Sequence, residues 1–98
     1  MTKIEFVLRS HKIKQVDLLE KSWELAIRQE KSKSKGIFKR GLLKQNIYKI
    51  VAGRCNPTVK TLQKISICIN SILKDRKEEI IYTVGDIIGD IDTEKAME

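Results

Sequence analysis

The segment KIVAGRCNPT, residues 49–58, combines a helix end, a tight turn and a new helix start. Gly53 is able to adopt the left-handed conformation that closes a helix. Pro57, the only proline, prevents the helix from resuming before the chain has turned. Thr58 then offers a side-chain oxygen to a backbone amide of the following helix. We therefore expect two helices joined by a compact connection at this point.

Apolar residues at helical spacing extend this pattern along most of the chain. They predict a first helix over residues 3–11, with Ile13 turned back into the core. The second helix begins near residue 14, runs to about residue 30 and buries one stripe: Val16, Leu19, Trp23, Ala26 and Ile27. A third helix around 42–52 and a fourth from residue 59 onward are predicted from their apolar residues: Leu42, Leu43, Ile47, Ile50 and Val51 in the third, and Val59, Leu62, Ile65, Ile69, Ile72 and Leu73 in the fourth.

The remaining segments are read as connections and a tail. Residues 31–41 contain two Gly, two Ser and five basic residues, which is typical of a loop. Residues 79–83 fit a short strand or a helix end, and Thr83 is expected to cap a short helix that ends at Ile88. The acidic end of the chain has few packing anchors and is expected to fray.

The predicted fold class is all-α, a bundle of four to five helices. At 98 residues the chain has room for one small core. We expect a domain over residues 1–76, with 31–41 as an inserted basic loop. Residues 77–98 form a C-terminal segment.

The charge distribution is more informative than the net charge of +7. No Asp or Glu occurs between Lys31 and Lys74, whereas basic residues recur throughout that stretch. A segregated positive field attracts polyanions, either nucleic acid or an anionic membrane surface. A merely solvated basic face is the plainer alternative.

Other classes of function find little support in the composition. Cys55 and Cys68 are read as reduced, cytosolic thiols, and His11 is the only histidine, so no metal site is expected. The N-terminal residues lack the apolar region of a signal peptide, and no stretch is apolar enough to span a membrane. No catalytic residue, cofactor site or phosphate-cradling Gly loop is visible, so we do not expect an enzyme.

Two blocks of sequence resemble the phage-repressor-like helix-turn-helix (Cro/C1, XRE) family. Residues 14–19 (KQVDLL) resemble the opening of its second helix. Residues 46–58 with 61–65 resemble its recognition helix, its Gly-containing turn and its fourth helix. Six residues fall at matching offsets in this second block: Ile47, Ile50, Gly53, Pro57, Leu62 and Ile65. The resemblance covers residues 4–73 and implies a lambda-repressor-like fold.

The chain departs from that family between the second and third helices. The family usually has a short turn there, whereas this chain has a longer second helix and a basic insertion. Some temperate-phage repressors of the family carry such an extension. The departure bears on the angle between the two helices and on where the recognition helix begins.

The resemblance implies a sequence-specific DNA-binding regulator of transcription, acting as a repressor. A recognition helix places its N-terminal residues nearest the base edges, where Gln45 and Asn46 lie here, and a side-chain amide matches adenine's exposed edge. The family pattern carries over onto these DNA-binding residues: Gln15, Lys44, Gln45, Asn46, Tyr48 and Lys49. We expect Arg54 and Asn56 to contact the sugar–phosphate backbone. Lys39 and Arg40 of the loop are expected to contact a flanking phosphate or the minor groove.

Each assignment has a plainer alternative. Gln45 and Asn46 are also explained as solvated first-turn residues, Tyr48 as packing over the domain edge, and the loop as a linker without contacts. Trp23 is read as core and His11 as a surface or partly buried residue.

The expected partners are double-stranded DNA and a second copy of the chain. Such domains read two half-sites about 34 Å apart, which favours a symmetric dimer. The excess of apolar residues in 78–91 suggests the dimer contact: Ile80, Ile81, Val84, Ile87, Ile88 and Ile91. A toxin or antirepressor as a further protein partner is left open. The expected location is the cytoplasm, for a bacterial or phage-encoded chain. The competing hypothesis is a basic adaptor that binds RNA or an anionic surface through 31–41, without sequence preference.

Overall fold

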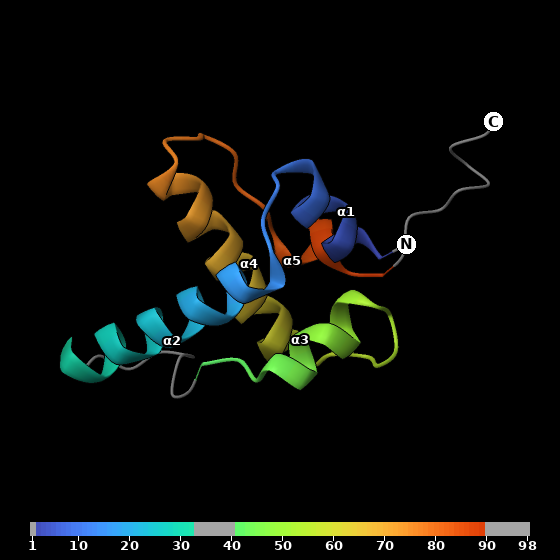
Figure 1. The fold of residues 1–98 in the computed structure, drawn as a ribbon, viewed down its shortest axis with the longest axis horizontal. Coiled ribbons are helices and arrows are strands. Elements are labelled where there is room, and N and C mark those ends of the chain that lie inside the picture. The colour runs from blue at the N-terminus through green and yellow to red at the C-terminus, as the bar shows by residue number, and fades with distance from the viewer. Residues whose placement is uncertain (1, 33–40, 90–98) are drawn as a thin grey trace.

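The protein is all-helical in the part of the chain that the structure describes. The computed structural model describes residues 2–32 and 41–89, and no strand occurs among them. The helices are α1 (Lys3–Ser10), α2 (Gln15–Ser32), α3 (Lys44–Val51), α4 (Val59–Asp75) and α5 (Val84–Ile87) (Figure 1). The expected all-α class and the number of helices are thereby confirmed, and the four longer helices begin within about two residues of their predicted starts.

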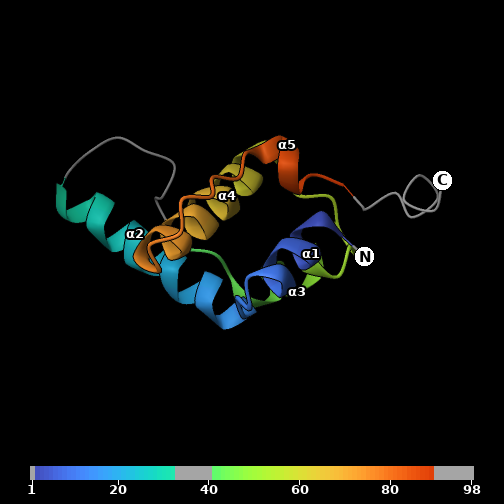
Figure 2. The same cartoon turned by 90° about the horizontal axis from the view of Figure 1, so that it is seen from above.

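The two long helices, α2 and α4, form the centre of the bundle. Helix α2 contacts both α4 and α3, while α5 contacts α4 and α1. The C-terminal half of α2 extends beyond the other helices in both views (Figures 1 and 2). The core is built largely from aliphatic residues, among them Leu18, Ile47, Ile65, Ile69, Leu73 and Ile87, each no more than 1% exposed.

The predicted core stripe of α2 is partly wrong. Trp23 is 42% exposed, and Val16 and Ile27 are about half exposed, so these three residues do not form the buried face. Ala26 is buried and Leu19 is partly buried, as expected, but the fully buried positions are Leu18 and Ser22. Ser22 was missed because it is polar, so hydrophobicity alone does not mark it as core. Ile13 is buried, as expected.

The connection between α3 and α4 forms as the sequence predicts. Gly53 adopts a left-handed backbone with φ of 76°. Its amide donates to the carbonyl of Ile50, and the Arg54 amide donates to the carbonyl of Lys49, which is the Schellman arrangement that ends helices. The Thr58 hydroxyl oxygen accepts from the Thr61 amide at 3.2 Å and caps α4.

The segment after α4 packs back onto the bundle. Asn70 makes two hydrogen bonds with the backbone of Tyr82, accepting from its N–H at 2.7 Å and donating to its C=O at 2.9 Å. The Tyr82 hydroxyl lies 2.7 Å from Nε2 of the partly buried His11. The short strand considered for 79–83 does not form, because these hydrogen bonds hold the segment against α4 instead. Thr83 is the N-cap of α5, where the Asp86 carboxylate accepts from its backbone amide.

Salt bridges form along the solvent-exposed side of α2. Glu24 and Arg28, one turn apart, are paired at 2.7 Å. Lys21 lies 2.6 Å from Asp75 at the end of α4 and 3.0 Å from Glu24. The hydrogen bond to Asp75 raises the pKa of Lys21, and the same bond lowers the pKa of Asp75. The contact between Lys21 and Asp75 links α2 to the end of α4.

Candidate nucleic-acid interface

Helix α3 has one buried side and one exposed side. Ile47, Ile50 and Val51 are each no more than 5% exposed and pack into the core. These positions recur at helical spacing, so the residues between them turn outward. The exposed side carries all five residues predicted from this helix: Lys44, Gln45, Asn46, Tyr48 and Lys49.

Two of the predicted residues meet where α2 and α3 begin. Gln15, the first residue of α2, and Lys44, the first residue of α3, line one groove of about 160 Å³. The floor of this groove is apolar, formed by Val16, Leu19 and Ile47. The structure thus brings together an amide and an ammonium group that lie far apart in sequence.

A second groove lies on the other side of α3. It measures about 380 Å³ and is bordered by Asn46 of α3 and by Asn56 of the following turn. Lys64 of α4 also lines it, together with Thr58 and Thr61. Sequence reasoning did not select Lys64, because it lies a full turn inside α4. Its position three residues after Thr61 was the available signal, since residues so spaced share a helix face.

Arg54 and Tyr48 are paired on the exposed side. The Arg54 guanidinium carbon lies 5.5 Å from the centre of the Tyr48 ring, within the range of a cation–π contact. Tyr48 is half exposed and therefore is not part of the core. The contact places a positive charge of the turn over the outward face of α3.

Acidic side chains compensate cations elsewhere on the molecule. In residues 2–32 and 41–89, the ion pairs involve Glu5, Glu24, Asp75 and Glu78, which lie in or directly beside α1, α2 and α4. None of these pairs includes a lysine of α3. The exposed side of α3 therefore keeps its positive charge.

Two predicted contact residues, Lys39 and Arg40, lie outside the described residues. The same holds for residues 33–38, which belong to the 31–41 segment on which the alternative adaptor hypothesis relies.

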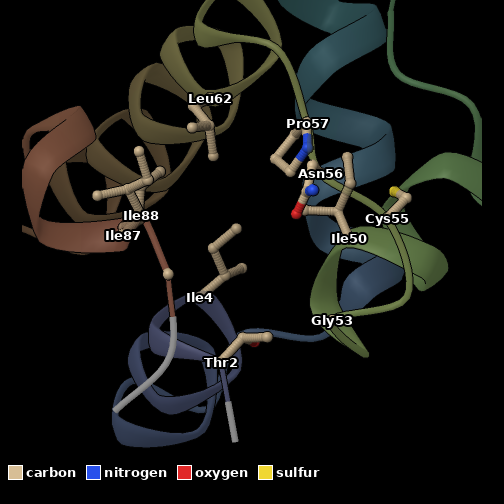
Figure 3. Close-up of a pocket in the computed structure, with 11 residues that line it drawn as sticks. Thr2, Ile4, Ile50, Gly53, Cys55, Asn56, Pro57, Leu62, Ile87 and Ile88 are labelled. Atoms are coloured by element: carbon tan, nitrogen blue, oxygen red, sulfur yellow. The ribbon is translucent and has the colours of Figure 1, made fainter. Parts of the chain in front are cut away.

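Another cavity, of about 330 Å³, lies between α1, α5 and the turn after α3 (Figure 3). Ile4, Ile50 and Leu62 form much of its wall, and Cys55 lies at its edge. Cys55 is exposed, whereas Cys68 is buried, and burial raises the pKa of the Cys68 thiol to about 12. The lining offers no pair of titratable groups for acid–base chemistry.

Within the described ranges, no three His, Cys, Asp or Glu side chains are grouped closely enough to hold a metal ion. None of the helices described there combines the length and apolar character needed to cross a membrane. Comparisons with protein-family models, curated proteins and solved structures gave no significant match. The function therefore has to be argued from the residues of this chain.

Proposed function

We propose that this protein is a sequence-specific DNA-binding transcriptional regulator that represses by occupying its site. The observation that carries the proposal is the first turn of α3. There Gln45 and Asn46 are exposed beside Lys44, on a helix whose opposite side is buried in the core. An α-helix fits the major groove, where amide side chains pair with adenine and lysine with guanine.

The surroundings of α3 suit a phosphate backbone on both sides. Gln15 and Lys44 border one groove, and Asn56 with Lys64 borders the other. Cations and amides in such flanking positions set the register of a protein on duplex DNA. Because acidic residues are missing from Lys31 to Lys74, no negative side chain of this stretch repels the negatively charged DNA.

The test measures base preference. Duplexes selected from a random pool are bound by the wild type and by Gln45→Ala and Asn46→Ala. We expect each substitution to cost about 1–3 kcal/mol on the selected duplex and to relax preference at particular base pairs. Gln63→Ala, an exposed glutamine of α4, is the matched control and should leave the preference unchanged.

If the two variants weaken every duplex equally, direct readout by α3 is excluded. Equal binding of RNA and of all duplexes by the wild type would favour the adaptor hypothesis instead. Both functions predict weaker binding at high salt, with a log–log slope of about −0.9 per phosphate on duplex DNA, so salt alone does not separate them.

We also propose that the protein acts as a homodimer. Ile80, Ile81 and Ile88 are 45%, 78% and 50% exposed, which is consistent with an apolar contact. Ile87 is buried within the chain and Val84 is partly buried, so they are used internally, and Ile91 lies outside the described residues. We propose the cytoplasm as the location of the protein. A further protein partner, such as a toxin or an antirepressor, is also part of the proposal.

Truncation after Asp75 is not a clean test of the dimer, because it removes Ile87 and Tyr82 from the bundle. The point variant Ile81→Lys leaves those contacts in place. We expect it to convert the dimer to a monomer in analytical ultracentrifugation. Ile27→Lys, at a half-exposed isoleucine of α2, is the control. If Ile81→Lys self-associates like the wild type, Ile81 is not in the contact.

A further inference from the structure

Two successive residues of α2 hold one peptide segment just ahead of α3. The hydroxyl oxygen of Ser22 accepts from the backbone amide of Leu42 at 2.7 Å. The indole Nε1 of Trp23 donates to the carbonyl of Leu42 at 3.1 Å. Both polar backbone groups of Leu42 are therefore bound by side chains of α2.

Gly41 completes this arrangement because it lies directly against the Trp23 indole. A Cβ atom at Gly41 would overlap the ring carbons Cγ, Cδ2 and Cε2. The overlap involves the body of a rigid ring and not the end of a flexible side chain. A residue other than glycine would thus displace either the indole or the backbone at this point.

The hydrogen bond from the Leu42 amide to Ser22 is buried away from water, which increases its importance. Ser22 is fully buried, and Leu42 is 6% exposed. The Ser22 hydroxyl donates its own hydrogen to the carbonyl of Leu19 at 2.8 Å, so its oxygen is oriented to accept from Leu42. A buried amide that loses its acceptor is costly, because no water replaces the lost partner.

The start of α3 has no comparable side-chain hydrogen bond from its own N-cap residue. Its N-cap is Leu43, and no side chain there caps the helix. The first fixed point before α3 is therefore Leu42, and Gln45 and Asn46 follow within one turn. A residue turns by about 100° around a helix axis, so a shift of the anchor by one residue would redirect both amides.

We propose that Ser22 and Trp23, with Gly41, are positioning residues that fix the contact face of α3 on α2. This inference rests on the proposed function and adds a determinant of specificity. It assigns a role to the half-exposed Trp23, and it explains how α3 keeps its place although residues 33–43 separate it from α2. The three residues are called the Leu42 clamp below.

The test uses three clamp variants with matched controls in the full chain. Ser22→Ala removes the acceptor, Trp23→Phe keeps a ring but removes the donor, and Gly41→Ala adds the clashing Cβ. Ser66→Ala, at a buried serine that bonds only within α4, is the control for Ser22→Ala. Gly85→Ala, where an added Cβ meets only an ordinary contact, is the control for Gly41→Ala.

Two quantities are measured at a temperature where every variant is folded by circular dichroism. The first is hydrogen exchange at the Leu42 amide, followed by NMR. The second is the affinity for the selected duplex divided by the affinity for a scrambled duplex. We expect Ser22→Ala to accelerate exchange at Leu42 about tenfold and each clamp variant to lower the affinity ratio about tenfold. The affinity for the scrambled duplex should stay within about twofold of the wild-type value, since phosphate contacts do not depend on the exact orientation of α3.

The inference is overturned if the clamp variants fold and keep the wild-type affinity ratio. It is also overturned if Ser66→Ala lowers the ratio as far as Ser22→Ala does. If Gly41→Ala does not fold, Ser22→Ala and Trp23→Phe decide the outcome. A wild type that binds the two duplexes equally overturns the proposed function and the inference with it. The two failures are distinct, because one is seen in the wild type and the other only in the variants.

Discussion

The two cysteines lie in opposite environments, which provides a test at the scale of single residues. Cys55 is exposed in the turn after α3, and Cys68 is fully buried in α4 with the pKa of its thiol raised to about 12. Only a thiolate reacts readily with alkylating reagents. We expect iodoacetamide at pH 8 to modify one thiol in the folded protein, at Cys55, and two in urea. Peptide mass spectrometry identifies the site, and rapid modification of Cys68 in the folded state would contradict the structure.

Trp23 shows where reasoning from single residues reached its limit. Its spacing with Leu19 and Ala26 predicted a core position, yet its indole packs on Gly41 and remains 42% exposed. The partner was not predictable, because Gly41 lies eighteen residues further along, beyond an insertion that helical spacing does not cross. By contrast, the burial of Cys68 follows from its place between isoleucines at helical spacing within one helix.

At the scale of elements, the end of α3 depends on one left-handed residue. Gly53 has a φ of 76°, a conformation that costs an L-residue about 1 kcal/mol or more. We expect Gly53→Ala to lower the free energy of unfolding by about 1 kcal/mol. Gly85→Ala, at a glycine of α5 without positive φ, should be neutral or slightly stabilising. Urea denaturation measures both, and equal effects of the two substitutions would show that the backbone conformation at Gly53 is not the cause.

Element boundaries were predictable where a local signal marks them. Gly53, Pro57 and Thr58 specify the end of α3 and the start of α4 through backbone conformation and capping, which depend on neighbouring residues alone. Thr2 shows the opposite case. Its hydroxyl oxygen caps α1, and the same hydroxyl donates to the carbonyl of Val51 at 2.7 Å. This link between the first residues and α3 depends on tertiary packing, for which the sequence has no local signal.

The candidate site divides in the same way. Gln45 and Asn46 were predicted to lie on an exposed helix face, and they do, because Ile47 and Ile50 fix which side of α3 is buried. Lys64 was missed because it lies a full turn inside α4, and the Leu42 clamp was missed because it forms where separate segments meet.

At the scale of the whole molecule, three charged groups contribute to how stability responds to pH. Hydrogen bonds lower the pKa of two carboxyl groups below 3.8, that of Asp75 through Lys21 and that of Asp86 through the Thr83 amide. Their contribution is present above pH 3.8 and is lost as the pH falls through the lowered values. The pKa of Lys21 is raised above 10.5, so its contribution is complete below that pH and is lost on further alkalinisation.

We therefore expect the melting temperature to be independent of these groups between about pH 5 and pH 9 and to fall on both sides. Differential scanning calorimetry across this range measures the effect. Asp86→Asn should reduce the acid-side fall, whereas Glu30→Gln, at an exposed residue of α2, should leave it unchanged. An acid-side fall of the same size in Asp86→Asn would exclude a contribution from this carboxylate.

The central claim is that the exposed face of α3 reads base edges in the major groove. The most direct measurement replaces single adenines of the selected duplex with 7-deazaadenine, which removes a major-groove acceptor and preserves base pairing. We expect at least one position to weaken wild-type binding about tenfold and to have no effect on Asn46→Ala or Gln45→Ala. If no adenine of the duplex is sensitive, or if the sensitive position affects both variants as much as the wild type, α3 does not read the major groove through these amides.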